Sequence, residues 1–330
     1  MPRAIPASRG RGAVSRCLRE ALSVLGHQPQ GLLVSPQGSR AAFANNAGSV
    51  IALQMASHFS AFSFVDRITG HEPGRRARGC FLVPPAVQGF LPSLAAEAVG
   101  QLAAWLAMSQ SAFRRRPVAG IAGEVQFRGA AQPGDTLDLA VEIASCDDEA
   151  VAYGGRAEVR GTAITALADC VGPMLPLEEF DAPEAVAARF ALLCGAGAPP
   201  GRFPGVSPLE YVVTGREPGR RLEAELRVPG SAPFFADHFP RRPVVPGTLL
   251  LDAQLRLAAA LAGESTGHAP RPQPRRVQNV KFRTFIPPEQ AVEIWAEMAH
   301  DTEGTVSIGA RTKGKPVSSG RVQMTTEEAE

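Results

Sequence analysis

The stretch Phe234–Gln254 reads FFADHFPRRPVVPGTLLLDAQ and is the most informative part of the chain. A histidine, His238, stands beside an aromatic residue, and a proline-rich turn follows it. The apolar run that follows predicts a helix. Pro246 fits its start, because the N–H that proline lacks would have no partner in the first turn of a helix. This helix carries Asp252, 14 residues after the histidine (252 − 238). The segment therefore combines a candidate base, a helix N-terminus and a candidate acid.

The same stretch is in register with the motif HFPxxPVMPGxLxxE/DAxxQ of the beta-hydroxyacyl-acyl-carrier-protein dehydratases of fatty acid synthesis. The residues that match are His238, Phe239, Pro240, Pro243, Val244, Pro246, Gly247, Leu249 and Asp252. The chain thus resembles that family, which implies a hotdog fold. The resemblance also implies an active site between two hotdog units, with the histidine from one unit and the carboxylate from the central helix of the other.

The overall composition is that of an ordinary globular chain. Of its 330 residues 45% are hydrophobic and 20% are charged, and the formal net charge of +2 argues against bulk nucleic-acid binding. No apolar run reaches the roughly 18 residues that a membrane span needs. Five widely spaced cysteines, an odd number without a CxxC pair, favour a reduced cytoplasmic compartment.

Residues 1–57 differ from the rest, with one acid (Glu20) and six arginines among many small residues. This composition resembles an organelle transit peptide. A solvated basic tail, or a start codon assigned too far upstream, gives the same composition, and we favour these two interpretations. We expect a poorly ordered extension in which residues 15–25 form a short helix.

The chain contains an internal repeat. Thr69–Arg76 reads TGHEPGRR and Thr214–Arg221 reads TGREPGRR, an offset of 145 residues (214 − 69). Phe127 and Phe282, each followed by arginine, match at an offset of 155 (282 − 127). Two matching blocks in the same order indicate a duplicated unit, and the larger second offset means that the first copy lacks ten residues between the blocks.

We therefore predict an α+β fold, a tandem double hotdog in which each unit is an antiparallel sheet wrapped around a long central helix. The expected helices cover 92–109 and 247–262. Runs of β-branched and aromatic residues predict strands at 121–128, 136–146, 150–159, 162–172, 276–284, 290–299, 304–312 and 316–325. The predicted domains are the extension 1–57, hotdog 1 at 58–177, a linker at 178–206 with a helix over 183–194, and hotdog 2 at 207–325.

The repeat changes which acid is expected to work with His238. Glu97 aligns with Asp252 at the offset of 155 (252 − 97), and the ten missing residues fall between Arg76 and Glu97. The first copy has therefore lost the counterpart of the histidine segment and keeps only an acid. By the resemblance, His238 faces Glu97 in one competent site, and Asp252 is the relic of a second site.

Neighbouring residues favour the same acid. Gln101 lies four residues after Glu97, hence on the same helix face. The pair resembles the family pattern EAxAQ, in which the glutamine orients the acid. Asp252 has Arg256 at the same spacing, and we expect this guanidinium to lower the pKa of Asp252 and keep it ionised.

The resemblance implies dehydration of (3R)-3-hydroxyacyl thioesters, bound to acyl carrier protein, in fatty acid or polyketide-like lipid synthesis. His238 would remove the C2 proton, which calls for a base with a near-neutral pKa. Glu97, with its pKa raised by an apolar tunnel, would protonate the departing C3 hydroxyl. The backbone N–H of Gly247 at a helix N-terminus would donate a hydrogen bond to the thioester oxygen.

Departures from the family motif surround the histidine. Asp237 replaces the usual Gly or Cys, and a carboxylate there would raise the pKa of His238. Arg241 and Arg242 would either line the tunnel mouth and attract an acidic carrier protein or a phosphopantetheine phosphate, or belong to a solvated loop. We favour the second interpretation, with an Asp237–Arg241 pair.

No metal-ligand spacing occurs, and the resemblance implies no cofactor beyond the phosphopantetheine that carries the substrate. The expected partners are acyl carrier protein and, within the chain, the second hotdog unit; a further homodimer stays open, as does acyl chain length. Two alternatives from other classes remain. One is a hotdog thioesterase or an enoyl-CoA hydratase, and the other is a non-catalytic acyl-carrier-binding partner with a decayed site.

Overall fold

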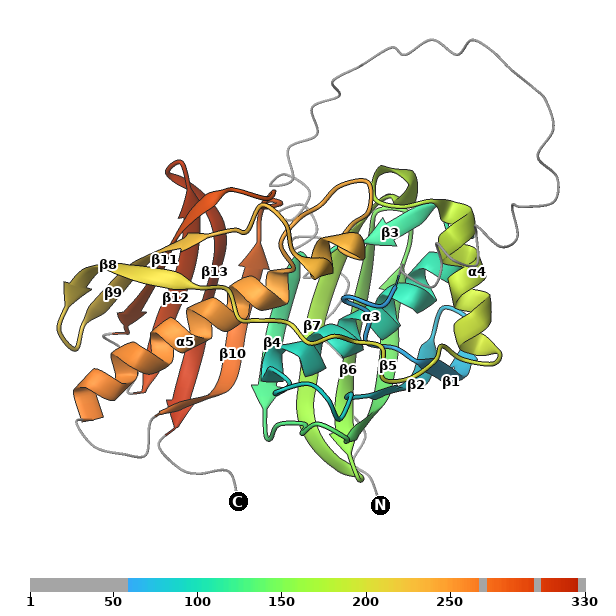
Figure 1. The fold of residues 1–330 in the computed structure, drawn as a ribbon, viewed down its shortest axis with the longest axis horizontal. Helices are drawn as coiled ribbons and strands as arrows, with labels where there is room; N and C mark the ends of the chain where they lie inside the picture. The colour runs from blue at the N-terminus through green and yellow to red at the C-terminus, as the bar shows by residue number, and fades with distance from the viewer. Residues whose placement is uncertain (1–58, 267–271, 300–303, 326–330) are drawn as a thin grey trace, which may run out of the picture.

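The computed structural model describes residues 59–266, 272–299 and 304–325. The basic extension 1–57 and its expected short helix lie outside the described residues. Figure 1 shows one large sheet with two long helices lying across the same face of it. The expected α+β class, an antiparallel sheet with few helices, is confirmed.

The elements of the first half follow the expected order. They are β1 (Arg67–Glu72), β2 (Arg76–Leu82), α3 (Pro92–Gln110), β3 (Arg115–Pro117), β4 (Ile121–Phe127), β5 (Thr136–Cys146), β6 (Ala150–Val159), β7 (Thr162–Pro176), the 3-10 turn η1 (Leu177–Glu179) and α4 (Pro183–Cys194). The short strand β3 was not foreseen. It pairs with the end of β7, where Pro117 lies opposite Met174, and β7 accordingly runs four residues beyond its expected end at 172.

The second half repeats the pattern. Its elements are β8 (Tyr211–Glu217), β9 (Arg221–Arg227), the 3-10 turn η2 (Pro233–Ala236), α5 (Gly247–Thr266), β10 (Gln273–Phe282), β11 (Ala291–Met298), β12 (Thr305–Thr312) and β13 (Lys315–Thr325). Both expected central helices are present, and α5 extends four residues beyond the expected end at 262.

The order of strands in the sheet is symmetric about its centre. It reads β1-β2-β5-β6-β7-β4 in the first half and continues β10-β13-β12-β11-β9-β8 in the second, so each strand meets its counterpart from the other end. The halves join where β4 pairs with β10, with Val125 opposite Val277. Because this central pair is hydrogen-bonded like any other in the sheet, the two halves form one continuous antiparallel surface.

The helices α3 and α5 pack on that surface and also touch each other. Helix α3 lies against β5 and β6, and α5 lies against β11 and β12. Their buried leucines include Leu94, Leu102 and Leu106 of α3 and Leu249 and Leu257 of α5. Each such side chain contributes about 1.5–3 kcal/mol by leaving water. Contact with the sheet on one side and the other helix on another explains why both helices are apolar around most of their circumference.

The loops that lead into the two helices differ as the repeat predicts. Residues 83–91 connect β2 to α3, whereas residues 228–246 connect β9 to α5. The second loop is ten residues longer (19 against 9), and it holds η2 and His238. The longer loop of the second half therefore contains the histidine segment, for which the shorter loop of the first half has no counterpart.

The connection between the halves is itself packed. The expected helix over 183–194 is present as α4, and it contacts β1 and α3 (Figure 1). Val186 and Leu193 of α4 are completely buried. The stretch 178–206 thus links the halves and also covers one edge of the first.

Candidate active site

His238 lies in the long loop between η2 and α5. Its Nδ1 is 3.1 Å from the carbonyl oxygen of Val244. A carbonyl oxygen only accepts hydrogen bonds, so Nδ1 carries the proton and Nε2 keeps its lone pair. The ring stacks on Phe239 and meets the edge of Phe62. The imidazole is thus held in one orientation, with an acceptor nitrogen available.

The preceding residue, Asp237, has a structural role. Its carboxylate is buried and accepts hydrogen bonds from the backbone N–H groups of Phe59 (2.5 Å), Ala61 (2.8 Å) and Phe62 (2.8 Å). The expected Asp237–Arg241 pair in a solvated loop is wrong, because these amides take up the carboxylate. Asp237 instead fastens the histidine loop to the segment that precedes β1.

The pKa of His238 is lowered to about 3, chiefly by burial and then by the positive charge of Arg116. The expectations of a near-neutral pKa and of an upward shift from Asp237 are both wrong. The side chain is only half-buried by area because one side faces a cavity, but it lies deep enough for desolvation to dominate. His238 is therefore uncharged over the physiological range.

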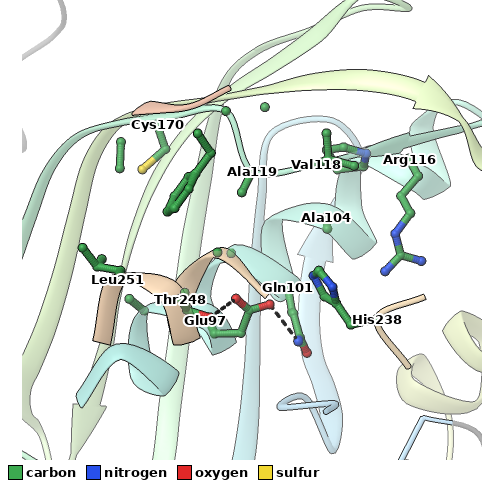
Figure 2. Close-up of a pocket in the computed structure, with 18 of the residues that line it drawn as sticks. Glu97, Gln101, Ala104, Arg116, Val118, Ala119, Cys170, His238, Thr248 and Leu251 are labelled. Carbon is green, nitrogen blue, oxygen red and sulfur yellow. Dashed lines mark hydrogen bonds between the residues drawn. The ribbon is translucent and has the colours of Figure 1, made fainter. Parts of the chain in front are cut away.

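Glu97 projects from α3 toward the same cavity. Its Oε2 accepts a hydrogen bond from the hydroxyl of Thr248 (2.8 Å), and its Oε1 accepts one from Nε2 of Gln101 (3.0 Å) (Figure 2). Burial raises the pKa of Glu97, although these hydrogen bonds and the charge of Arg116 act in the opposite direction. The net shift favours the protonated form that a proton donor needs.

Gln101 ties Glu97 to the chain before β1. Its Nε2 also donates to the carbonyl oxygen of Phe62 (2.9 Å), and its Oε1 accepts from the N–H of Phe64 (2.8 Å). These bonds fix the amide orientation, so that an N–H must point at the Glu97 carboxyl. The expected contact between Gln101 and Glu97 is present.

A cavity of about 200 Å³ brings these groups together. His238 comes from the second half of the chain and Glu97 from the first, and both line it. Figure 2 shows Glu97 between Thr248 and Gln101, with the imidazole of His238 beside Gln101. Further lining residues include Gln101, Arg116, Tyr153, Cys170, Gly247 and Phe282.

The other expected site residues lie elsewhere. Asp252 does not line this cavity; its Oδ2 accepts a hydrogen bond from Nε of Arg256 at 3.0 Å. That ion pair was expected, but the predicted lowering of the pKa of Asp252 is wrong. Burial outweighs Arg256 and raises it. The guanidinium also bonds the carbonyl oxygen of Leu209 and lies over the ring of Tyr211, which makes the pair part of the packing.

The two loop arginines also have protein partners outside the cavity. Arg241 donates to the carbonyl oxygen of Glu178 at 2.9 Å. Arg242 pairs with Glu179 at 3.2 Å, and its guanidinium lies over the ring of Phe285. Both remain exposed at the surface. They attach the histidine loop to the turn after β7.

Among the cavity residues that the sequence did not single out, Thr248 and Arg116 lie beside the acid and the histidine. Thr248 stands inside the motif, as the second residue of α5, and its hydroxyl donates a hydrogen bond to Glu97 of the other half. A signal for it existed, because Ser93 occupies the same place in the first copy (248 − 93 = 155). Arg116 lies on β3, and nothing in its sequence surroundings sets it apart from the neighbouring arginines.

In the part of the chain that the structure describes, no helix is long and apolar enough to cross a membrane. Within the same residues, no group of three or more His, Cys, Asp or Glu side chains could hold a metal ion.

Comparison with known proteins defines the class to which the second half is similar. Residues 214–321, which are 108 of the 330, match the family described as ApeI-like, ApeI dehydratase. The resemblance to the hotdog thioester dehydratases is thereby confirmed.

Particular relatives are the 3-hydroxyacyl-[acyl-carrier-protein] dehydratases FabZ of two bacteria. That of Rickettsia rickettsii (strain Sheila Smith) is 33% identical over 82 residues, 24% of this chain and 57% of the relative. That of Polaromonas sp. (strain JS666) is 46% identical over 54 residues, 16% of this chain and 37% of the relative. The chain thus spans little more than half the length of the first relative.

A solved structure extends the likeness to both halves. A protein described as an oleoyl thioesterase from Lactobacillus plantarum superposes with a TM-score of 0.50, over 77% of this chain and 96% of that chain. The two sequences are 10% identical, so the likeness concerns the fold alone.

Proposed function

We propose that this protein dehydrates (3R)-3-hydroxyacyl thioesters to trans-2-enoyl thioesters. The observation that carries the proposal is that His238 and Glu97, from opposite halves of the chain, line one cavity. An uncharged imidazole and a carboxyl group with a raised pKa are the base and the acid that such an elimination needs. The dehydratase family that the second half matches and the FabZ relatives of the chain support the same chemistry.

We infer further that the fold is a tandem double hotdog that arose by duplication. The symmetric strand order and the matched helices α3 and α5 support this inference. The proposed units are hotdog 1 at 58–177, which lacks the histidine segment, and hotdog 2 at 207–325, joined by 178–206. In this arrangement the two units form a pseudo-dimer with one competent site and one relic at Asp252.

The proposed reaction moves two protons. Nε2 of His238 takes the proton from C2, and the C2–H electron pair delocalises into the thioester carbonyl as an enolate. The enolate electrons then form the C2–C3 double bond while the C3–O bond breaks and Glu97 gives its proton to the leaving hydroxyl, which departs as water. Thr248 and Gln101 hold the Glu97 carboxyl in place throughout. The proton on His238 returns to Glu97, directly or through water, and restores both groups.

The thioester oxygen gains negative charge as C2 loses its proton. The N–H of Gly247, the first residue of α5, is the proposed donor to it, because the N-terminus of a helix carries partial positive charge. Gly247 lines the cavity, and a Cβ atom there would come within 3.1 Å of the Phe282 ring. The lack of a side chain thus leaves the backbone open to the substrate.

The carrier of the acyl group is proposed to be acyl carrier protein. The relatives FabZ are named for that substrate. Carrier proteins of this kind are acidic, and the exposed Arg241 and Arg242 at the outer side of the histidine loop would attract one.

A single assay tests the proposed function. The purified chain is given (3R)-3-hydroxyoctanoyl thioesters of N-acetylcysteamine, coenzyme A and acyl carrier protein, and the products are measured by mass spectrometry. We expect loss of water to give the enoyl thioester, and hydration of the enoyl thioester in the reverse assay. Release of free acid and thiol would favour a thioesterase instead. Binding without turnover of any of the three would favour a non-catalytic partner.

Near neutral pH, the rate of the reaction should fall as the pH rises and should not fall as the pH is lowered. Glu97 acts when protonated, and burial raises its pKa above the ordinary 4.5, so the rate should fall as pH rises through that raised pKa. His238 acts when neutral, and its pKa of about 3 leaves it in that form above about pH 4. We expect kcat/KM, measured from pH 4 to 9, to show the alkaline limb. An acidic limb centred near 6.5 would contradict the proposed state of His238.

The size of the residue at position 100 should determine which acyl chains fit. Gly100 lines the cavity on α3, and a Cβ atom there would lie 3.4 Å from the hydroxyl of Tyr153. Leucine at this position would fill the space between α3 and β6. We expect Gly100→Leu to lower kcat/KM for an octanoyl substrate at least about tenfold more than for a butanoyl substrate. Gly100→Ala should cause a smaller shift, and equal losses for both chain lengths would contradict the placement.

A further inference from the structure

Arg116 places a positive charge in the cavity for which the mechanism above has no use. It belongs to β3, whose backbone pairing with β7 sets Arg116 opposite Leu175. Figure 2 shows its guanidinium next to the imidazole of His238, on the side away from Leu251 and Cys170. Its neighbour on the strand, Arg115, does not line the cavity, as expected from the alternation of side chains along a strand.

The guanidinium of Arg116 packs on the aromatic ring of Phe239 and forms no ion pair with an acid among the described residues. Its Cζ lies 4.2 Å from the centre of the Phe239 ring. Within the described residues it has no hydrogen bond and no ion pair. A guanidinium has five N–H donors, so those that face the cavity remain available to a ligand.

The nearby acids are already engaged by other donors. Asp181, Glu97 and Asp237 lie close enough to influence the charge of Arg116. Asp237 binds three backbone amides, both oxygens of Glu97 accept hydrogen bonds from Thr248 and Gln101, and Asp181 accepts one from the N–H of Ala182. A cation out of water without a direct partner is costly, and a negatively charged ligand atom offsets that cost.

The position beside His238 limits which atom of an acyl thioester can reach Arg116. His238 acts at C2, and the thioester carbonyl is bonded to C2. The phosphate of phosphopantetheine lies a whole pantetheine arm away from that carbon. The carbonyl oxygen is also the atom that becomes negative when the C2 proton leaves.

We propose that Arg116 donates hydrogen bonds to the thioester oxygen of the bound substrate and forms, with the Gly247 N–H, an oxyanion site in this cavity. This inference rests on the proposed function, since it takes an acyl thioester as the ligand. It assigns to the first half of the chain a second catalytic residue besides Glu97. It also explains how a weakly basic imidazole can remove the proton: the enolate forms directly against a fixed positive charge.

The binding test uses octanoate and octanamide with the full chain, measured by calorimetry at pH 7.5. The carboxylate imitates the charged oxygen of the enolate, and the amide has the same length without the charge. We expect the wild type to bind octanoate about tenfold or more tightly than octanamide. Arg116→Met should lose that preference and keep its affinity for octanamide, Arg116→Lys should keep part of it, and Arg115→Met should behave like the wild type.

The kinetic test uses the N-acetylcysteamine thioester, which contains no phosphate. We expect Arg116→Met to lower kcat about 100- to 1,000-fold with KM within about threefold of the wild type. A normal kcat in Arg116→Met, or an equal octanoate preference in Arg116→Met and the wild type, would overturn the proposal. So would an effect confined to the KM of substrates that carry a phosphate. If the wild type prefers octanoate through Arg116 but dehydrates nothing, the proposed reaction fails and the oxyanion site stands.

Discussion

Glu97→Gln should lower the kcat of dehydration about 100- to 10,000-fold, the range by which a positioned general acid accelerates such steps. Glutamine has nearly the shape of glutamate and can still bond Thr248 and Gln101, but it has no proton to give to the leaving hydroxyl. The measurement is the steady-state rate with the 3-hydroxyoctanoyl thioester. The thermal midpoint is recorded beside it, and we expect it to remain close to that of the wild type.

The repeat supplies a matched control. Asp252 occupies the position in α5 that Glu97 occupies in α3, the sixth residue of each helix, but it lies outside the cavity. We expect Asp252→Asn to keep most of the activity and to lose a little stability through the weakened contact with Arg256. If Asp252→Asn abolished dehydration while Glu97→Gln spared it, the pairing of His238 with Glu97 across the two halves would be wrong.

His238→Ala should abolish measurable dehydration, a loss of about a thousandfold or more, because no other side chain in the cavity is proposed to take the C2 proton. The backbone of the loop is held by other contacts, among them the three amides bonded to Asp237 and the bond from the Val244 N–H to the carbonyl oxygen of residue 238. We therefore expect the variant to fold.

Adding imidazole to the His238→Ala variant shows whether its activity is lost because the base is missing or because the loop is disturbed. The missing ring leaves space at the cavity wall, and free imidazole can occupy it and accept the proton. We expect part of the rate to return in proportion to the imidazole concentration, and none to return in the Glu97→Gln variant. An unimpaired rate in His238→Ala would rule out this residue as the base.

Together these variants examine an arrangement that depends on both halves of the chain. The proposed base stands in a loop of the second half, the proposed acid stands on the helix of the first, and Thr248 of the second half bonds that acid. The dehydratase family model matches residues 214–321, which contain the histidine but not Glu97. Variants should therefore be made in the first half as well as in the half that resembles known dehydratases.

Much of this could be predicted from the sequence, because the signals are local or periodic. The apolar runs and turn residues predicted helices α3 and α5 and most strands to within a few residues. The repeat predicted the ten-residue difference between the loops that precede the helices, and the alignment of Glu97 with Asp252. Such features depend only on how far apart residues lie along the chain, which can be read directly from the sequence.

The surroundings of each charge could not be predicted in this way. The sequence placed Asp237 beside His238 and suggested a raised pKa, but the folded chain turns that carboxylate toward the amides of Phe59, Ala61 and Phe62. It likewise suggested a lowered pKa for Asp252, where burial prevails over Arg256. Desolvation depends on every atom packed around a group, including atoms more than a hundred residues away in the chain.

For this protein, then, the sequence alone predicted the order of most elements, the repeat, the position of the histidine and the acid with which it should work. Only the tertiary structure decided that β3 brings Arg116 to the imidazole, that Thr248 also holds Glu97, and that His238 is uncharged. The reason is physical. A motif records which residues are near in the chain, whereas the pKa of a group and the partners of a hydrogen bond depend on which residues are near in space.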